Sequence, residues 1–175
     1  MVYIITGGPG FGKTTVINLL AELNFPVCQE NARELLASYQ DRKGVVDRNK
    51  FPVDFEKNVA KERINFLLSI ADNTIAFSDR GLPDQIAYSR CKNKMPSNYI
   101  TENTAKYKYA QIVFVAPPWE EIFVQDDIRN ENFKEASAIH EQILNAYSEY
   151  NYKIINLPLV NPRERVRFIL NFLGI

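Results

Sequence analysis

The feature that most constrains this chain is a glycine-rich segment near its start, followed at once by a lysine and a threonine. Residues 7–14 read GGPGFGKT, which satisfies the pattern G-x-x-x-x-G-K-[ST] at every required position. A short apolar run precedes it at residues 2–5, and helical periodicity follows it from residue 14. A strand, a glycine-rich turn and a helix in this order direct backbone N–H groups toward a phosphate. The sequence therefore predicts a phosphate-binding loop (a Walker A loop, or P-loop).

Each residue type in this loop has a predicted role in binding ATP or GTP together with Mg²⁺. Lys13 brings a positive charge to the β- and γ-phosphates, and the Thr14 hydroxyl is a hard oxygen ligand for Mg²⁺. Thr15 is expected to help hold the α-phosphate, and the glycines let the backbone approach the phosphates closely. The alternative is a glycine turn beside an exposed lysine. The predicted nucleotide-binding residues of the loop are Gly8, Pro9, Gly10, Phe11, Gly12, Lys13, Thr14 and Thr15.

Composition argues against several other classes of protein. The chain of 175 residues is long enough for one continuous core, so residues 1–175 are expected to form a single domain. Lys plus Arg and Asp plus Glu are equal at 21 each, so no overall field attracts nucleic acid or an anionic membrane. The two cysteines and the single histidine lack zinc-ligand spacing. No apolar run approaches the ~20 residues of a membrane span, and the cysteine usage favours reduced thiols in a cytoplasmic setting. We expect a monomer or a homodimer.

Helical and strand patterns alternate along the chain. Five short apolar strands separated by helices indicate a parallel sheet with helices on both faces, and ligands then collect beyond the carboxyl ends of the strands. Asn161 and Pro162 supply an N-cap and a first-turn proline for a closing helix. Strands are predicted at residues 2–5, 25–28, 74–77, 110–115 and 152–157, and helices from residue 14 and at residues 31–40, 51–71, 139–150 and 161–173.

Asp79 and Arg80 directly follow residues 75–78, at the tip of the third predicted strand, and both are predicted to be catalytic and to contact the substrate. A carboxylate at this position can organise Mg²⁺ and its waters, or accept a proton from an attacking hydroxyl. An arginine can hold a phosphate or a substrate through two parallel hydrogen bonds. The alternative is a surface turn with a solvated ion pair, because turns favour these residue types.

Two further segments carry candidate residues. Glu30 and Arg33 follow the second predicted strand and would bind the acceptor substrate, although a helix-start carboxylate paired with its neighbour explains them equally well. The polar residues 123–133 separate two helices, where a lid would bring Arg129 over the γ-phosphate, stabilise transition-state charge and exclude water. The alternative for Arg129 is a solvated helix end.

The order of these motifs resembles the P-loop kinase-like NTPases of the AAA-type ATPase family, the group that includes the ribosylnicotinamide kinase domain of the bacterial NAD-metabolism regulator. The resemblance implies a three-layer α/β fold of the nucleoside-monophosphate-kinase type, with strand order 2-3-1-4-5. It also implies Mg-ATP as donor, a small acceptor near Glu30, Arg33 and Asp79, and Arg129 in a lid. The matching segments are residues 7–15, 30–34, 78–84, 87–88, 118–120, 126–129, 157–158 and 164–166.

Three residues outside these motifs have alternative interpretations. Trp119 could stack on a base, but packing at a helix entry is the simpler interpretation. His140 follows an apolar residue on an amphipathic helix and is expected to be solvated or to pack at the periphery. Arg165 lies near the C-terminal connection, where kinases of this kind place the adenine.

We therefore expect a phosphotransferase that moves the γ-phosphoryl group of Mg-ATP to a small nucleoside- or nucleotide-like acceptor. Lys13, Arg80 and Arg129 would neutralise developing charge, while Thr14 and Asp79 would organise Mg²⁺, with Asp79 also acting as the base. The alternatives are a slow ATPase or GTPase that needs no acceptor, and a nucleotide-gated binding module. A nucleic-acid 5′-end kinase is disfavoured, because the balanced charge predicts weak binding to a polyanion.

Overall fold

The structure is a computed structural model that describes residues 1–29, 55–123 and 131–175. Three of the predicted site residues, Glu30, Arg33 and Arg129, lie outside the described residues. The same holds for the helix predicted at residues 31–40.

The described residues form a five-stranded parallel sheet in the order β2-β3-β1-β4-β5, which confirms the predicted strand order. In the central strand β1, Ile5 lies opposite Asp79 of β3 on one side and opposite Phe114 of β4 on the other. The P-loop leaves the sheet at the end of β1, so the ends of β3 and β4 flank it. The strands are β1 (Val2–Thr6), β2 (Val27–Cys28), β3 (Ala76–Asp79), β4 (Ile112–Val115) and β5 (Lys153–Asn156).

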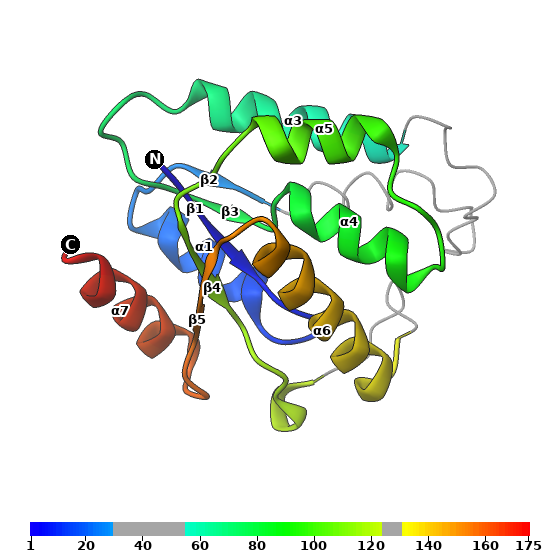
Figure 1. The fold of residues 1–175 in the computed structure, drawn as a ribbon. Helices are drawn as coiled ribbons and strands as arrows, with labels where there is room; N and C mark the ends of the chain where they lie inside the picture. The colour runs from blue at the N-terminus through cyan, green and yellow to red at the C-terminus, as the bar shows by residue number, and fades with distance from the viewer. Residues whose placement is uncertain (30–54, 124–130) are drawn as a thin grey trace, which may run out of the picture.

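Helices cover both faces of this sheet, giving the predicted three layers (Figure 1). On one face lie α1 (Lys13–Glu22) and α7 (Pro162–Leu173). A short 3₁₀-helix, η2 (Glu120–Ile122), follows β4. On the other face lie α3 (Phe55–Ser69), α4 (Leu82–Cys91), α5 (Asn98–Lys106) and α6 (Phe133–Glu149).

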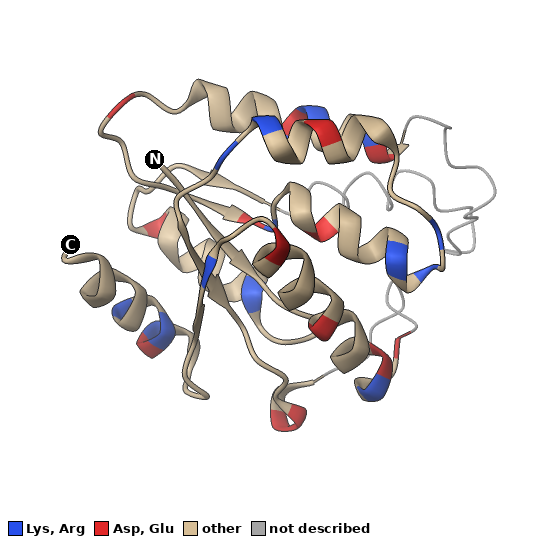
Figure 2. Ribbon diagram, in the orientation of Figure 1, with Lys and Arg blue, Asp and Glu red and all other residues tan. Residues whose placement is uncertain are grey.

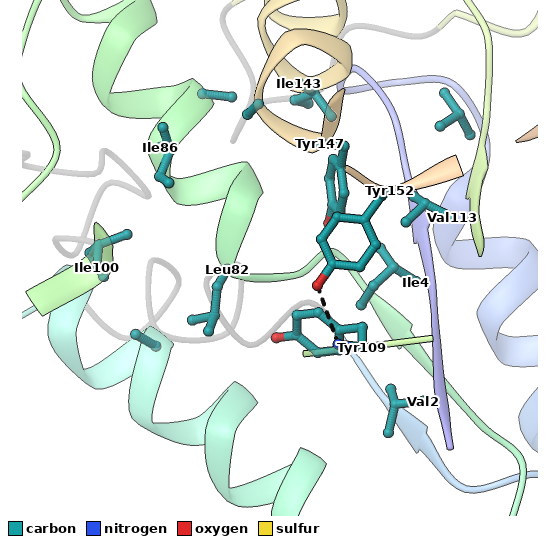
Figure 3. Close-up of a cluster of buried hydrophobic side chains, with 14 of the residues drawn as sticks. Val2, Ile4, Leu82, Ile86, Ile100, Tyr109, Val113, Ile143, Tyr147 and Tyr152 are labelled. Atoms are coloured by element: carbon teal, nitrogen blue, oxygen red, sulfur yellow. Dashed lines mark hydrogen bonds between the residues drawn. The ribbon is translucent and has the colours of Figure 1, made fainter. Parts of the chain in front are cut away.

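Alternation along the strands supplies a separate core to each layer of helices. In β1, Ile4 belongs to the core beneath α3–α6, whereas Ile5 belongs to the core beneath α1 and α7. Successive side chains of a strand point to opposite faces, so one apolar strand fills both cores. Figure 3 shows the first core, where the Tyr152 hydroxyl accepts a hydrogen bond from the backbone N–H of Tyr109 at 3.3 Å.

Local capping explains where two helices begin. The Asn132 side chain accepts a hydrogen bond from the N–H of Glu135, whose carboxylate accepts one from the N–H of Asn132. The start of α7 is capped as predicted, because Asn161 Oδ1 accepts from the N–H of Glu164 at 3.0 Å and Pro162 occupies the first turn.

Helices α4 and α5 were not predicted from periodicity. The buried face of α4 includes polar residues such as Asp84, Gln85 and Ser89, which hide the apolar spacing that marks a helix. The third strand ends two residues later than predicted, at Asp79 instead of Phe77.

Charged residues are distributed along the described elements with both signs together. Every α-helix of the described part carries at least one acidic and one basic residue (Figure 2). Within the described ranges, no helix has the length and apolarity needed to cross a membrane.

Candidate active site

The P-loop runs from the end of β1 to the start of α1, and three of its glycines, Gly7, Gly10 and Gly12, have positive φ angles. Gly10 and Gly12 have φ angles of +79° and +82°, in the left-handed region that glycine adopts without steric cost. A Cβ on Gly10 would lie 2.6 Å from a ring carbon of Phe123. Packing against the protein therefore requires glycine at position 10, in addition to the predicted approach to phosphate.

Lys13 begins α1, and its side chain is buried over the loop. Its Nζ donates a hydrogen bond to the carbonyl oxygen of Gly8 at 2.7 Å. The ammonium group therefore lies within the loop, beside the N-terminus of a helix, where unsatisfied N–H groups and the helix dipole already favour an anion. The alternative interpretation of an exposed lysine is wrong, since Lys13 is buried.

Thr14 and Asp79, the two predicted magnesium ligands, lie together although 65 residues separate them. The Thr14 hydroxyl donates to Asp79 Oδ2 at 3.4 Å, and the Asp79 side chain is buried at the end of β3. A hydroxyl and a carboxylate are hard oxygen donors of the kind that Mg²⁺ takes, usually with phosphate and water completing its coordination. In the parts of the chain that the structure covers, no group of three or more His, Cys, Asp or Glu could hold a metal.

Arg80 turns back from the end of β3 toward the P-loop. Its Nη1 donates to the carbonyl oxygen of Gly7 at 3.1 Å and pairs with Asp84 Oδ1 at 3.0 Å, and its guanidinium lies 5.1 Å from the ring centre of Tyr88. The side chain is only 2% exposed, so the alternative interpretation of a solvated surface ion pair is wrong. Arg63 of α3, which was not predicted, donates to the carbonyl oxygen of the next residue, Gly81, at 3.0 Å.

The other side of the P-loop contacts aromatic side chains. The buried Phe11 ring lies 5.9 to 6.2 Å, centre to centre, from the rings of Phe123, Phe133 and His140. The loop N–H of Gly8 donates to His140 Nδ1 at 3.4 Å. His140 is buried, so its expected solvated or peripheral position is wrong. Burial lowers the pKa of His140, which keeps the imidazole neutral near pH 7 and able to accept this hydrogen bond.

Arg165 of α7 contacts the P-loop on the same side as these aromatic rings. Its Nη1 donates to the carbonyl oxygen of Phe11 at 2.9 Å, and its Nε donates to that of Pro158 at 3.0 Å. The guanidinium lies 5.1 Å from the ring centre of Trp119, so this tryptophan packs against a buried arginine. Burial of Arg165, which is 1% exposed, lowers the pKa of its guanidinium. Sequence reasoning missed this contact, because 154 residues separate Arg165 from Phe11.

Comparison with known protein families identifies the family of this chain. Residues 2–165 match the family described as AAA domain. The chain belongs to this family. The resemblance seen in the motif order is thereby confirmed, and the match extends over both the P-loop and Arg165. No match was found among the curated proteins.

Solved structures share the fold of this AAA domain at low sequence identity, and two of the three described here are of kinases. NadR protein in complex with NR has a TM-score of 0.70 and 18% identity over 99% of this chain, which spans only 51% of the NadR chain. Deoxyadenosine kinase from M. mycoides with bound dATP has a TM-score of 0.65 and 15% identity, with both chains fully covered. Thymidylate kinase from Candida albicans has a TM-score of 0.67 and 15% identity, covering 99% of this chain and 90% of that chain. At these identities the likeness shows the fold.

The fold brings four predicted site residues to one end of the sheet. Lys13 and Thr14 come from α1, and Asp79 and Arg80 from the end of β3. Thr15 is exposed at the first turn of α1. The roles assigned to all of these residues stay predictions, as do those of Glu30, Arg33 and Arg129.

Proposed function

We propose that this AAA domain transfers the γ-phosphoryl group of Mg-ATP to a small acceptor of the nucleoside or nucleotide class. The juxtaposition of Lys13, Thr14 and Asp79 supports this proposal. A buried ammonium group, a hydroxyl and a carboxylate meet where a helix N-terminus faces outward from the carboxyl ends of parallel strands. Phosphoryl transfer depends almost entirely on this kind of positioning and charge stabilisation.

Each residue has a distinct proposed role. Lys13 would move from the Gly8 carbonyl oxygen to the β- and γ-phosphate oxygens when the triphosphate binds, and the loop N–H groups would hold the remaining oxygens. Asp79 would accept the proton of the attacking acceptor hydroxyl. Bound Mg²⁺, held by Thr14 and through water by Asp79, would neutralise charge between the β- and γ-phosphates. GTP could replace ATP as donor.

The acceptor would lie on the β3 side of the P-loop. Asp79 and Arg80 would face it there, and we propose that Glu30 and Arg33 complete its binding site while Arg129 closes over the γ-phosphate. Two solved structures of the same fold support a small acceptor, since NadR protein is described in complex with NR and deoxyadenosine kinase is described with bound dATP.

Calorimetry tests the first half of this proposal. Titration of the protein with Mg-ATP and with Mg-GTP should release or absorb heat with at least one of them, and Lys13→Ala should abolish that heat. Lys134→Ala, which removes an exposed lysine of α6, is the matched control and should bind like the wild type. If both titrations of the wild type stay flat at millimolar nucleotide, the proposal fails.

An acceptor panel tests the second half. Turnover of Mg-ATP is measured alone and with nucleosides, nucleoside monophosphates and ribosylnicotinamide, and the phosphorylated product is identified by mass spectrometry. Stimulation by one acceptor, with a matching product, supports the phosphotransferase. The same slow hydrolysis across the whole panel would instead indicate an acceptor-independent NTPase, and binding without hydrolysis would indicate a nucleotide-gated module.

A further inference from the structure

One buried carboxylate beside the P-loop has no role in the chemistry described above, yet it accepts four hydrogen bonds. Asp84 lies in the first turn of α4 and is 1% exposed. Its Oδ1 accepts from Thr6 Oγ1 at 2.6 Å and from Arg80 Nη1 at 3.0 Å. Its Oδ2 accepts from the N–H of Gly81 at 2.9 Å and from the Tyr147 hydroxyl at 2.6 Å. The carboxylate therefore joins β1, the end of β3, α4 and α6.

The Tyr147 hydroxyl reaches this carboxylate through space that a glycine leaves open. Figure 3 shows Tyr147 projecting from α6 into the core between Ile4 of β1 and Leu82 at the start of α4. A Cβ on Gly81 would lie 2.8 Å from the Tyr147 hydroxyl oxygen. Burial and the charge of Asp84 raise the pKa of Tyr147 well above its ordinary value, so the hydroxyl stays protonated and donates.

Arg80 has a backbone conformation that an arginine rarely adopts. Its φ is +74°, in the left-handed region, whereas Gly81 beside it has a φ of −133° that any residue adopts. Hydrogen bonds hold this conformation, from the N–H of Arg80 to the Ile5 carbonyl at 3.0 Å and from the Ser78 hydroxyl to the Arg80 carbonyl at 2.7 Å. Glycine would relieve this strain, so an arginine here indicates that its side chain is used.

The left-handed turn aims the Arg80 side chain at both the P-loop and Asp84. One nitrogen, Nη1, contacts the Gly7 carbonyl oxygen at 3.1 Å and Asp84 Oδ1 at 3.0 Å. A buried guanidinium is costly unless a carboxylate is paired with it, so the charge of Asp84 keeps Arg80 in the interior and against the loop. Thr6, which shares Oδ1 with Arg80, immediately precedes Gly7 in the chain.

We infer that Asp84 is a positioning residue, which fixes the Arg80 guanidinium against Gly7 and thereby sets the P-loop relative to Asp79. Asp79 and Arg80 are adjacent in sequence, and Gly7 is the first residue of the loop that contains Lys13. Asp84 would thus fix the position of the P-loop relative to the end of β3 without itself contacting the nucleotide. Its effect on turnover rests on the proposed function, whereas its effect on the conformation of the loop does not.

Two substitutions, one of Asp84 and one of its hydrogen-bond donor Tyr147, separate a positioning role from simple stabilisation. Asp84→Asn keeps the size of the side chain but removes the charge that holds Arg80. Tyr147→Phe removes a donor to Oδ2 and leaves Arg80, Thr6 and the P-loop untouched, so it is the matched control. Both variants should lose thermal stability, because each breaks a buried hydrogen bond.

Hydrogen exchange and turnover are then compared at a temperature where all three proteins are folded. We expect Asp84→Asn to speed amide exchange in the peptide covering residues 2–12 by about tenfold or more, because local opening controls that rate. We also expect its Mg-ATP turnover to fall by about tenfold or more. Tyr147→Phe should stay within about twofold of the wild type in both measurements. Equal exchange and equal turnover in the two variants would overturn the inference.

The inference stays testable if the wild type does not bind Mg-ATP, and also if Asp84→Asn does not fold. If the wild type does not bind Mg-ATP, the proposed function fails, and the exchange of residues 2–12 alone decides whether Asp84 positions the loop. If Asp84→Asn does not fold, Thr6→Val replaces it, since this near-isosteric change removes one donor to Oδ1. Thr6→Val should raise loop exchange above that of Tyr147→Phe, and no difference between them would overturn the inference.

Discussion

The two sides of the P-loop differ in their contacts: paired buried charges lie on one side, and aromatic rings together with the buried Arg165 lie on the other. On the side of β3, the loop and the start of α1 contact buried charges, with Arg80 on the Gly7 carbonyl and Asp79 near the Thr14 hydroxyl. On the side of β4, Phe11 packs among aromatic rings, and a Cβ on Gly10 would strike the ring of Phe123. Both sides flank the same strand end, because β1 lies between β3 and β4 in the sheet.

From this difference we expect the β3 side to take part in the chemistry and the β4 side to anchor the loop. Buried charges cost free energy to desolvate, so their concentration on the β3 side fits a place where charge moves during a reaction. Aromatic packing contributes to stability without specifying chemistry, so the β4 side fits an anchor. Substitutions on the β3 side should therefore reduce turnover, and substitutions on the β4 side should reduce stability.

The largest effect is expected from Asp79→Asn on the β3 side. Because the amide cannot accept the acceptor proton, turnover should fall by about 10²- to 10⁴-fold while Mg-ATP affinity is kept. Steady-state rates and calorimetry on the same samples measure the two quantities. Asp72→Asn, at an exposed aspartate shortly before β3, is the control and should keep full turnover. Full activity of Asp79→Asn would refute its role as the base.

Phe11→Ala tests the β4 side. Removing this buried ring leaves a cavity among Phe123, Phe133 and His140 and should lower the free energy of unfolding by about 3–5 kcal/mol. Denaturant unfolding followed by circular dichroism measures this loss. Phe172→Ala, at a ring that is 41% exposed, should cost clearly less. Equal losses would show that the aromatic cluster does not anchor the loop.

A smaller effect is expected from Arg165→Met. The change keeps an unbranched side chain but removes the donors to the Phe11 and Pro158 carbonyl oxygens, so stability should fall by about 1–3 kcal/mol. Trp119 is the only tryptophan of the chain, so its fluorescence should change with the loss of the guanidinium beside it. Arg167→Met, at an exposed arginine of the same helix, should leave emission unchanged. An unchanged spectrum in Arg165→Met would contradict the contact.

The smallest effect is a pH dependence due to His140. Its pKa in the folded protein lies below the ordinary 6.5, mainly because of burial, so the unfolded chain binds a proton first as the pH falls. The stability that neutral His140 contributes is therefore complete above about pH 6.5 and is lost as the pH falls toward the lower folded pKa. Urea unfolding from pH 7.5 down to pH 5 should show this loss in the wild type but not in His140→Gln. If the free energy of unfolding changed with pH in the same way in both proteins, His140 would not be the cause of the pH dependence.

Sequence reasoning succeeded where the signal is local or depends on the order of motifs. The P-loop pattern and its flanking strand and helix lie within about twenty residues, and the structure contains them as predicted. Strand order followed from the resemblance, since alternating strands and helices alone do not specify which strands are neighbours. The close approach of Asp79 to Thr14 followed from the rule that ligands collect at strand ends.

The failures have a common physical cause. His140 and Asp84 are polar residues on buried helix faces, and their hydrogen-bond partners lie 132 and 63 residues away, in the P-loop and in α6. Burial of a polar group is tolerated only when such a partner is present, and spacing along the chain does not show the partner. Helix α4 was missed for the same reason, because three of its buried residues are polar.

The sequence by itself determined that a strand, a phosphate-binding loop and a helix begin this chain, because dihedral preferences and apolar periodicity act over a few residues. Only the tertiary structure decided what surrounds that loop: buried charges from the end of β3 on one side, aromatic rings and Arg165 on the other. Desolvation and packing depend on which distant segments meet, and those meetings exist only once the sheet has assembled.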